Sequence, residues 1–298
     1  MATLKDITRR IGSVKKTAQI TKAMQMVAAA RLRRTQDALE NNRPYADKMA
    51  EVVGDLVRQS GDEIHPLMEE RPEPRKLELL VVSTDRGLCG GLNTNLFRKV
   101  MAFARANENR YASISLNVVG RKAREHFKRR ELQVRTGQNQ IFTGVPRFEL
   151  IKPLAEDLTR AFLTGEVDEV RVFFTRFHSM MTQRPDEVTL LPLQPTTREE
   201  GEEGASAAGA PVGTDYIYEP SREGLLETLL PRYIQVRLYW ILLEAQTSEF
   251  AARMTAMDSA TSNAKEMIDR LTLTYNRARQ AAITKELMDI VNGAEALR

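Results

Sequence analysis

The chain has 298 residues, of which 28% are charged and 6% aromatic, and it carries a net charge of +4 with an isoelectric point near 9.2. This length allows two domains, and the high charge with few aromatic residues suits helical rods better than one large core. A single cysteine, Cys89, rules out an internal disulfide framework and suits a reducing compartment. No apolar stretch is long enough to span a bilayer, so the sequence predicts a soluble chain.

The first 60 residues are predicted to form one long, basic helix. Apolar residues at its start are spaced three and four apart, at Leu4, Ile7, Ile11, Val14 and Ala18. No glycine or proline occurs between Gly12 and Pro44, and residues 1–34 carry nine Lys or Arg against one acid, Asp6. Such a helix is typical of a transit peptide, a membrane-surface helix, a nucleic-acid arm or a face that meets an acidic protein. The residues alone leave all four open.

Residues 75–195 are predicted to form an α/β domain after a linker with Pro72 and Pro74. Strands are expected at 77–82, 114–119, 170–174 and 188–193. Helices are expected at about 93–106, 121–130 and 148–163. Strands that alternate with helices indicate an open, mostly parallel, Rossmann-like sheet covered on both faces.

The chain is predicted to end in a second long helix, over 214–298, after a mobile low-complexity loop at 196–213. Neither glycine nor proline occurs between Arg232 and Asn292. Hydrophobic or small residues alternate four and three apart, at Phe250, Met254, Met257, Thr261, Ala264, Ile268, Leu271, Tyr275, Ala278 and Ala282. This is the seam of a heptad repeat, and its simplest partner is the N-terminal helix in an antiparallel coiled coil. Pro231, near the start of the helix, is expected to kink it.

The glycine-rich turn at 83–93 is the best candidate for an enzyme site. It follows a strand and precedes a helix, as a phosphate cradle does. However, it matches neither common phosphate-binding motif, because its glycines are wrongly spaced and no lysine follows them. A tight turn that needs positive φ angles is therefore the favoured interpretation.

No other residues assemble an active site. The three histidines, His65, His126 and His178, are scattered, with no second ligand at metal-binding spacing. The lone cysteine lacks a catalytic motif, and the basic run at 121–130 is typical of a solvated helix. The sequence thus predicts no cofactor and no metal.

Three blocks resemble the gamma subunit of rotary F-type ATP synthases. They are ITKAMQMVAA at 20–29, STDRGLCGGLN at 83–93 and LTYNRARQAAIT at 273–284. Each block lies, in the right order, on the helix or turn that the residues had already predicted. The resemblance also implies that the basic N-terminus is the first helix of the mature protein and not a cleaved presequence.

The resemblance implies a function for the helical pair. In this family the coiled coil is a rotor shaft inside a hexamer of alpha and beta subunits, and it couples a proton-carrying ring of membrane c subunits to catalytic sites in other chains. The expected partners are these subunits and an epsilon-type small stalk subunit, with an inhibitory subunit left open and no nucleic acid. The chain itself is expected to be non-catalytic.

Residue roles follow from the same resemblance. Met24, Arg279, Gln280 and Thr284 match family positions that face the hexamer. The basic residues expected to face its acidic segments are Arg9, Arg10, Lys15, Arg31, Arg33 and Arg34. Tyr216, Tyr218 and Glu219 match the segment that touches the membrane ring. An ordinary solvated helical face remains the alternative for each of the hexamer-facing positions.

The resemblance leaves source and competing functions to be weighed. The family's chloroplast members carry a cysteine pair that this chain lacks, so thiol regulation is not expected. A peripheral complex on the cytoplasmic face of a bacterial inner membrane is the favoured location, with the matrix side of the mitochondrial inner membrane as the alternative. The competing functions are a basic coiled-coil adaptor for nucleic acid or a membrane surface, and a nucleotide-dependent enzyme.

Overall fold

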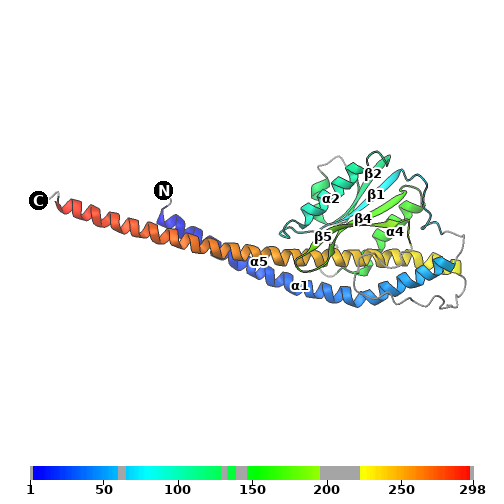
Figure 1. The fold of residues 1–298 in the computed structure, drawn as a ribbon, viewed down its shortest axis with the longest axis horizontal. Coiled ribbons are helices and arrows are strands. Elements are labelled where there is room, and N and C mark those ends of the chain that lie inside the picture. Colours follow the sequence, from blue (N-terminus) through cyan, green and yellow to red (C-terminus); the bar gives the residue numbers. More distant parts are fainter. Residues whose placement is uncertain (1–2, 60–64, 129–132, 139–145, 195–221, 296–298) are drawn as a thin grey trace. The chain divides into compact units, whose positions relative to one another are not determined.

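The computed structural model describes residues 3–59, 65–128, 133–138, 146–194 and 222–295 (Figure 1). The loop predicted at 196–213 lies outside these residues. The chain divides into two compact units. One comprises Met1–Arg31 with Arg253–Arg298, and the other Leu32–Ala252. Each long helix therefore contributes residues to both units.

Two helices account for the ends of the chain, as predicted. α1 spans Leu4–Gln59 and α5 spans Arg222–Glu295. α1 begins at a capping box in which the Thr3 hydroxyl donates to Asp6 Oδ2 at 2.7 Å, while the Asp6 amide donates to Thr3 Oγ1 at 3.3 Å. The hydrogen bonds that the Thr3 hydroxyl and the Thr3 amide donate to the carboxylate lower the pKa of Asp6. Both helices continue through an internal proline, Pro44 in α1 and Pro231 in α5.

The predicted heptad seam is confirmed in the unit formed by the two helix ends. From Thr261 to Met288, the side chains that are not fully exposed are those of the predicted seam: Thr261, Ala264, Ile268, Leu271, Tyr275, Ala278 and Ala282. On α1, the apolar residues from Leu4 to Ala18 are likewise at least partly buried. Hydrophobic periodicity alone thus identified the contact faces of both helices.

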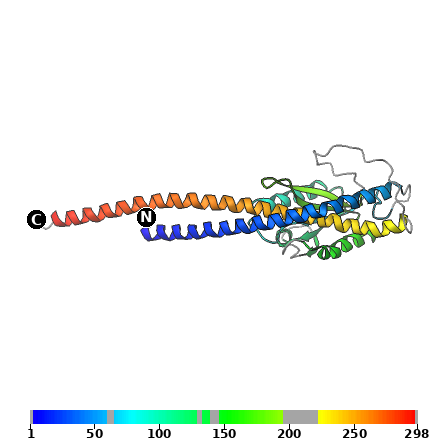
Figure 2. The same ribbon diagram turned by 90° about the horizontal axis from the view of Figure 1, so that it is seen from below.

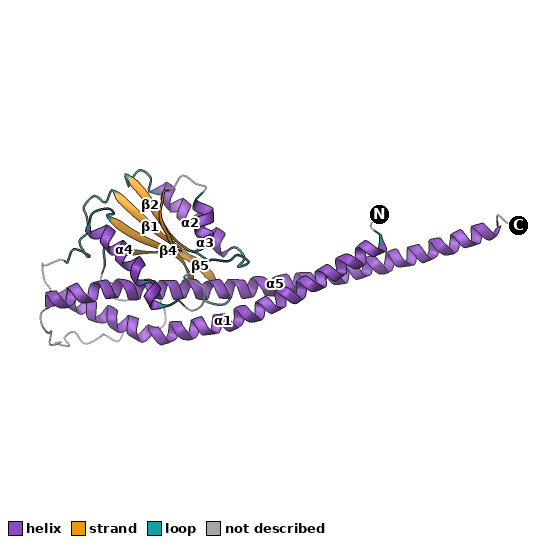
Figure 3. Cartoon of the chain, turned by 180° about the vertical axis from the view of Figure 1, so that it is seen from behind, coloured by secondary structure: helices purple, strands orange, loops and turns teal. Residues whose placement is uncertain are grey.

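The other unit contains a five-stranded sheet (Figure 3). The strands are β1 (Lys76–Val82), β2 (Ser113–Val119), β3 (Gln133–Gln138), β4 (Glu169–Phe177) and β5 (Gln183–Leu191). Their order is β3-β2-β1-β4-β5, and all neighbours pair in parallel except β4 with β5. The predicted mixed α/β class with a Rossmann-like sheet is confirmed.

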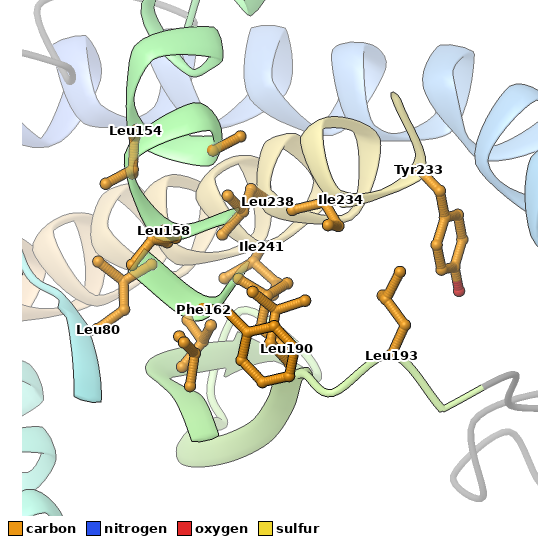
Figure 4. Packing of buried hydrophobic residues seen from close by; sticks show 14 of the residues in the cluster. Leu80, Leu154, Leu158, Phe162, Leu190, Leu193, Tyr233, Ile234, Leu238 and Ile241 are labelled. Atoms are coloured by element: carbon orange, nitrogen blue, oxygen red, sulfur yellow. The ribbon is translucent and has the colours of Figure 1, made fainter. Parts of the chain in front are cut away.

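Helices cover both faces of the sheet, as expected. The connecting helices are α2 (Leu92–Ala106), α3 (Arg121–Phe127), the short 3-10 helix η1 (Phe148–Leu150) and α4 (Lys152–Leu163). One core cluster joins the sheet to α2 and α3 through residues such as Leu96 and Phe127. The other joins it to α4, to the end of α1 and to α5, with Leu80, Phe162 and Ile241 packed together (Figure 4).

Three local predictions need correction. The expected strand at 188–193 is the end of a longer hairpin strand that begins at Gln183. The helix expected at 148–163 is divided into η1 and α4. β3 was not predicted at all, because its sequence, QVRTGQ, is polar and lacks alternation. β3 is held by pairing with β2, which no local pattern reveals.

A cluster of charged side chains links β3 to β1 and α4. Glu78, in the middle of β1, is fully buried, and Arg135 of β3 donates to both of its carboxylate oxygens at 2.9 and 3.0 Å. Arg135 also donates to Asp157 of α4 at 2.8 Å. Burial raises the pKa of Glu78, although the hydrogen bonds and charge of Arg135 oppose this shift.

Arg135→Met is expected to destabilise the fold by about 3 to 5 kcal/mol near neutral pH, because it leaves the Glu78 carboxylate buried and unpaired. A carboxyl group whose folded pKa is raised favours folding in its protonated form, and this contribution is lost as the pH rises through that pKa. The penalty should therefore shrink as the pH falls from neutrality towards 4.5, the ordinary value of the Glu78 pKa. Urea unfolding of the parent chain and of the Arg135→Met variant across that pH range measures the penalty. The control is Arg160→Met, an exposed partner of Asp157, and a penalty that does not change with pH would refute the explanation.

Candidate partner-binding surface

Two polar contacts set the register of the helical pair. Thr21 Oγ1 lies 2.8 Å from Thr261 Oγ1, and Gln25 Nε2 donates to Asp258 Oδ1 at 2.7 Å. Each hydroxyl also has a backbone acceptor one turn earlier in its own helix, the Ala18 carbonyl at 3.1 Å for Thr21 and the Met257 carbonyl at 2.7 Å for Thr261, so either threonine can donate to the other. Because the two helices are antiparallel, moving the same number of residues back from Thr21 and forward from Thr261 places Leu4 beside Ala278.

The residues that the sequence assigned to partner contacts on α1 lie on its accessible surface. Met24 is half-buried at the edge of the seam, between Thr21 and Ala28. The six basic residues are exposed: Arg9, Arg10, Lys15, Arg31, Arg33 and Arg34. The first four belong to the unit of paired helix ends, and the last two to the unit with the sheet. Their exposure leaves these cations accessible to partner subunits.

α5 continues beyond the first turn of α1 (Figure 2). Arg279, Gln280 and Thr284 are exposed on this last part. Met24 of α1 lies opposite the part of α5 near Asp258, because the next residue, Gln25, contacts Asp258. Met24 and Arg279 are therefore about 30 Å apart along the helix axis. Within the unit of paired helix ends, the assigned residues are therefore spread along the helix axis rather than gathered into one site. Tyr216, Tyr218 and Glu219 lie outside the described residues.

Sequence reasoning missed four exposed apolar side chains near the end of α5. They are Ile283, Leu287, Met288 and Ile290. None of them belongs to the seam. Exposed apolar side chains of this kind favour binding when a partner protein buries them. The signal was present in the sequence, as large apolar residues at positions that the heptad pattern assigns to solvent.

The glycine-rich turn is confirmed as a tight turn with positive φ angles. Gly90 has φ 58°, and Leu88, a non-glycine residue, has φ 65°. The Asn93 side chain bridges the turn, since its Nδ2 donates to Thr84 Oγ1 at 2.8 Å and its Oδ1 accepts from the Thr84 amide at 3.4 Å. The turn is thus braced by its own side chains.

Two residues of the same turn, Ser83 and Asp85, also hydrogen-bond to the start of the neighbouring helix α3. The Arg121 amide donates to Asp85 Oδ1 at 3.0 Å, and the Ala123 amide donates to Ser83 Oγ at 2.9 Å. Amides at a helix N-terminus are the groups that bind phosphate in nucleotide sites. At the start of α3 two of these amides are satisfied within the chain.

The histidines do not form a metal site. His126 stacks on Phe97 with ring centroids 4.5 Å apart, while His65 Nδ1 accepts from the Leu67 amide at 3.1 Å. Burial lowers the pKa of His65. Within the described ranges, no group of three His, Cys, Asp or Glu residues is placed to hold a metal ion. The basic helix α3 pairs with its own acid, since Arg121 and Lys122 both contact Glu125.

Comparison of the chain with known proteins identifies its family. A family model described as ATP synthase matches residues 3–297. ATP synthase gamma chains from Anaeromyxobacter sp. (strain Fw109-5) and Geobacter sp. (strain M21) are each 46% identical to this chain, with full coverage of both sequences.

Solved structures agree on the fold. A chain of the Euglena gracilis mitochondrial ATP synthase, from a structure of OSCP, F1 and the c-ring, superimposes with a TM-score of 0.66 at 19% identity, covering 99% of this chain and 94% of that one. A chain of the rotor from the same enzyme gives a TM-score of 0.63 at 19% identity, covering 94% and 98%. The full-length sequence matches go further than the fold, and they show that the chain belongs to the family of ATP synthase gamma chains.

Proposed function

We propose that the chain is the central rotor subunit of an F-type ATP synthase, which transmits rotation of a membrane proton ring to a catalytic hexamer. The observation that carries this proposal is the full-length match, at 46% identity, to ATP synthase gamma chains. The described geometry supports it, because a narrow antiparallel helical pair with an exposed end suits a shaft that enters a sleeve of other subunits.

The chain is proposed to be non-catalytic. The glycine-rich turn at 83–93 matches neither common phosphate-binding motif, and its Asn93 and Thr84 side chains are hydrogen-bonded to each other. ATP would then be bound and hydrolysed in the alpha and beta subunits of the hexamer. The chain contributes by changing the conformations of those subunits as it turns.

The purified chain, free of partners, is expected to hydrolyse no ATP. It is also expected to be poorly stable, because the paired helix ends bury little area against each other without a surrounding sleeve. A coupled-enzyme ATPase assay of the purified chain tests the absence of ATP hydrolysis. Native mass spectrometry compares the tagged chain alone with the chain and its co-purified subunits. The proposed function predicts a complex with six nucleotide-binding subunits, and turnover by the chain alone would overturn the non-catalytic assignment.

Contacts with the hexamer are assigned to both helices. Arg9, Arg10, Lys15, Arg31, Arg33 and Arg34 would pair with acidic segments. Exposed pairs of this kind contribute about 0 to 1 kcal/mol each, so they exchange readily as the shaft turns. Arg279, Gln280 and Thr284 would hydrogen-bond to loops of the catalytic subunits near the end of α5. Tyr216, Tyr218 and Glu219 would contact the ring of c subunits, and an epsilon-type subunit would complete the stalk.

Met24→Lys is expected to reduce the coupling of rotation to proton transport. The half-buried thioether would be replaced by an ammonium group, which forms a new ion pair with the sleeve at some rotor angles only. If that pair is worth about 1.4 kcal/mol, rotation slows about tenfold. Proton pumping per ATP hydrolysed, measured in inverted vesicles, should fall while hydrolysis persists. Met24→Leu is the matched control, and unchanged pumping efficiency in the lysine variant would argue against the assignment.

The proposed location is the cytoplasmic face of a bacterial inner membrane, as part of a peripheral complex. The full-length relatives reported above are bacterial proteins. Among the described helices, none is long and apolar enough to cross a bilayer. A nucleic-acid or membrane-surface adaptor, the competing function, would bind anionic polymers or vesicles with strong salt dependence, and none of the sequence matches points to it.

A further inference from the structure

A pocket of about 230 Å³ lies where α1, η1 and α5 meet, within the unit that contains the sheet. Its walls are aromatic, with Tyr45 from α1, Phe148 from η1, and Tyr239 and Trp240 from α5. Three separate elements therefore shape it. Because Tyr45, Tyr239 and Trp240 project from long helices, the pocket is formed before any partner arrives.

The pocket contains a concentration of aromatic side chains, and these side chains remain accessible to solvent. The chain has one tryptophan, seven tyrosines and ten phenylalanines, and four of these side chains line this pocket. Tyr45 is 50% exposed, and the other three are only partly buried. Tryptophan, tyrosine and arginine are the residues most enriched at the energetic centres of protein interfaces. The composition of this pocket is that of an interface anchor rather than of a core.

Arg232 adds a positive charge to the rim of the pocket. Its guanidinium carbon lies 4.3 Å from the centre of the Phe148 ring, and Tyr239 meets the same ring edge to face at 5.7 Å. A guanidinium group stacked on a ring keeps its in-plane N–H donors available for a carboxylate. Among the described residues no carboxylate forms an ion pair with Arg232, and the pocket lining contains no acidic side chain.

We propose that this pocket docks a partner polypeptide, which inserts one aromatic side chain and pairs a neighbouring carboxylate with Arg232. The aromatic walls favour a ring over a polar side chain, and the unpaired guanidinium favours an acidic segment over a basic one. The inference rests on the proposed function only in taking the partner to be another subunit of the same complex.

Trp240 makes the proposal measurable in the full-length chain, because it is the only tryptophan and its emission reports on the pocket directly. The probe is the blocked dipeptide N-acetyl-Asp-Phe-amide, which carries the two expected groups and no tryptophan. A saturable change in Trp240 emission is expected. N-acetyl-Asn-Phe-amide should bind about tenfold more weakly, since it cannot form the charged pair with Arg232. Absence of a saturable change, or equal affinity for the two dipeptides, would overturn the proposal.

Two variants localise the binding. Arg232→Met should weaken binding of the aspartyl dipeptide about tenfold and leave the asparaginyl dipeptide unaffected. Ala46→Leu, which fills the pocket from α1, should abolish binding of both. The matched control is Arg43→Met, which removes an exposed cation of α1 that contacts Asp47 and does not line the pocket. An equal effect of Arg43→Met and Arg232→Met would show that the dipeptide responds only to overall charge, and would contradict the assignment.

The assembled complex tests whether a polypeptide occupies the pocket. Ala46→Cys in a Cys89→Ser background places one thiol at the pocket, and its reaction with a maleimide is compared in the isolated chain and in the purified complex. At least tenfold slower labelling in the complex is expected, with full labelling restored in urea. Equal rates in a complex that has assembled would overturn this proposal while leaving the rotor function intact. Failure of the parent chain to enter any complex would instead refute the rotor function.

Discussion

Cross-linking α5 at Lys265 to one catalytic subunit is expected to stop multiple-turnover ATP hydrolysis by the assembled complex. Lys265 is exposed and follows the seam residue Ala264, so its side chain faces away from the helical contact and towards the proposed sleeve. A disulfide there would join rotor and stator covalently. The hydrolysis rate should fall to that of the fraction of complexes that escapes cross-linking, and reduction should restore it.

The experiment uses Lys265→Cys in a Cys89→Ser background, with a second cysteine on the facing surface of the catalytic subunit. Serine suits position 89, because its hydroxyl can still accept the hydrogen bond that Asn93 Nδ2 donates to the buried Cys89 sulfur at 3.4 Å. Disulfide formation requires Cα atoms about 4.4 to 6.8 Å apart, so the bond itself locates the shaft surface. The reduced complex is the control. Full turnover with quantitative cross-linking would exclude rotation of this segment against the hexamer.

Gly120→Ala is expected to cause a large loss of stability in the unit that contains the sheet. Gly120 has φ 95° and ψ 143°, a conformation that side-chain-bearing residues rarely adopt. A Cβ atom there would lie 2.3 Å from the Ser83 carbonyl oxygen and 2.8 Å from its carbonyl carbon. The backbone of the β1–α2 turn would have to move away, with loss of hydrogen bonds such as that from the Lys122 amide to the Thr84 carbonyl at 3.0 Å.

The expected cost is about 3 kcal/mol or more, from backbone strain together with the broken hydrogen bonds. This corresponds to a fall in melting temperature of about 6 to 12 °C for a unit of this size. Gly54→Ala is the matched control, because Gly54 lies inside α1 with only the end of the Arg58 side chain nearby, at 3.9 Å. It should raise stability by about 0.5 to 1 kcal/mol. Thermal unfolding followed by circular dichroism compares the two, and a Gly120→Ala melting temperature equal to that of the parent would disprove the steric argument.

Much of the fold was predictable because its signals are local. The seam from Phe250 to Ala282 is visible in the spacing of side chains along one helix, and the buried strand at 77–82 is visible as an apolar run. The family resemblance identified the function, since its three blocks lie on these same elements. The tight turn at 83–93 was also predicted, because a cluster of glycines favours positive φ angles; Gly90 adopts one, although Leu88 does as well.

The rest depended on contacts between residues far apart in the chain. β3 could not be predicted, because a polar strand is stabilised by pairing with β2 and by the ion cluster of Arg135 with Glu78. The pairing of Thr21 with Thr261, 240 residues apart, sets the register of the helices and hence which part of α5 extends past α1.

The sequence by itself determined the two long helices, their contact faces, the class of the sheet and the family, because periodicity and motifs are properties of neighbouring residues. Only the tertiary structure decided that Asp85 and Ser83 accept hydrogen bonds from the first amides of α3, and that Tyr45, Phe148 and Trp240 meet in one pocket beside Arg232. Those arrangements join segments separated by tens to hundreds of residues. Their geometry follows from the packing of the whole unit, and no local pattern of residues encodes it.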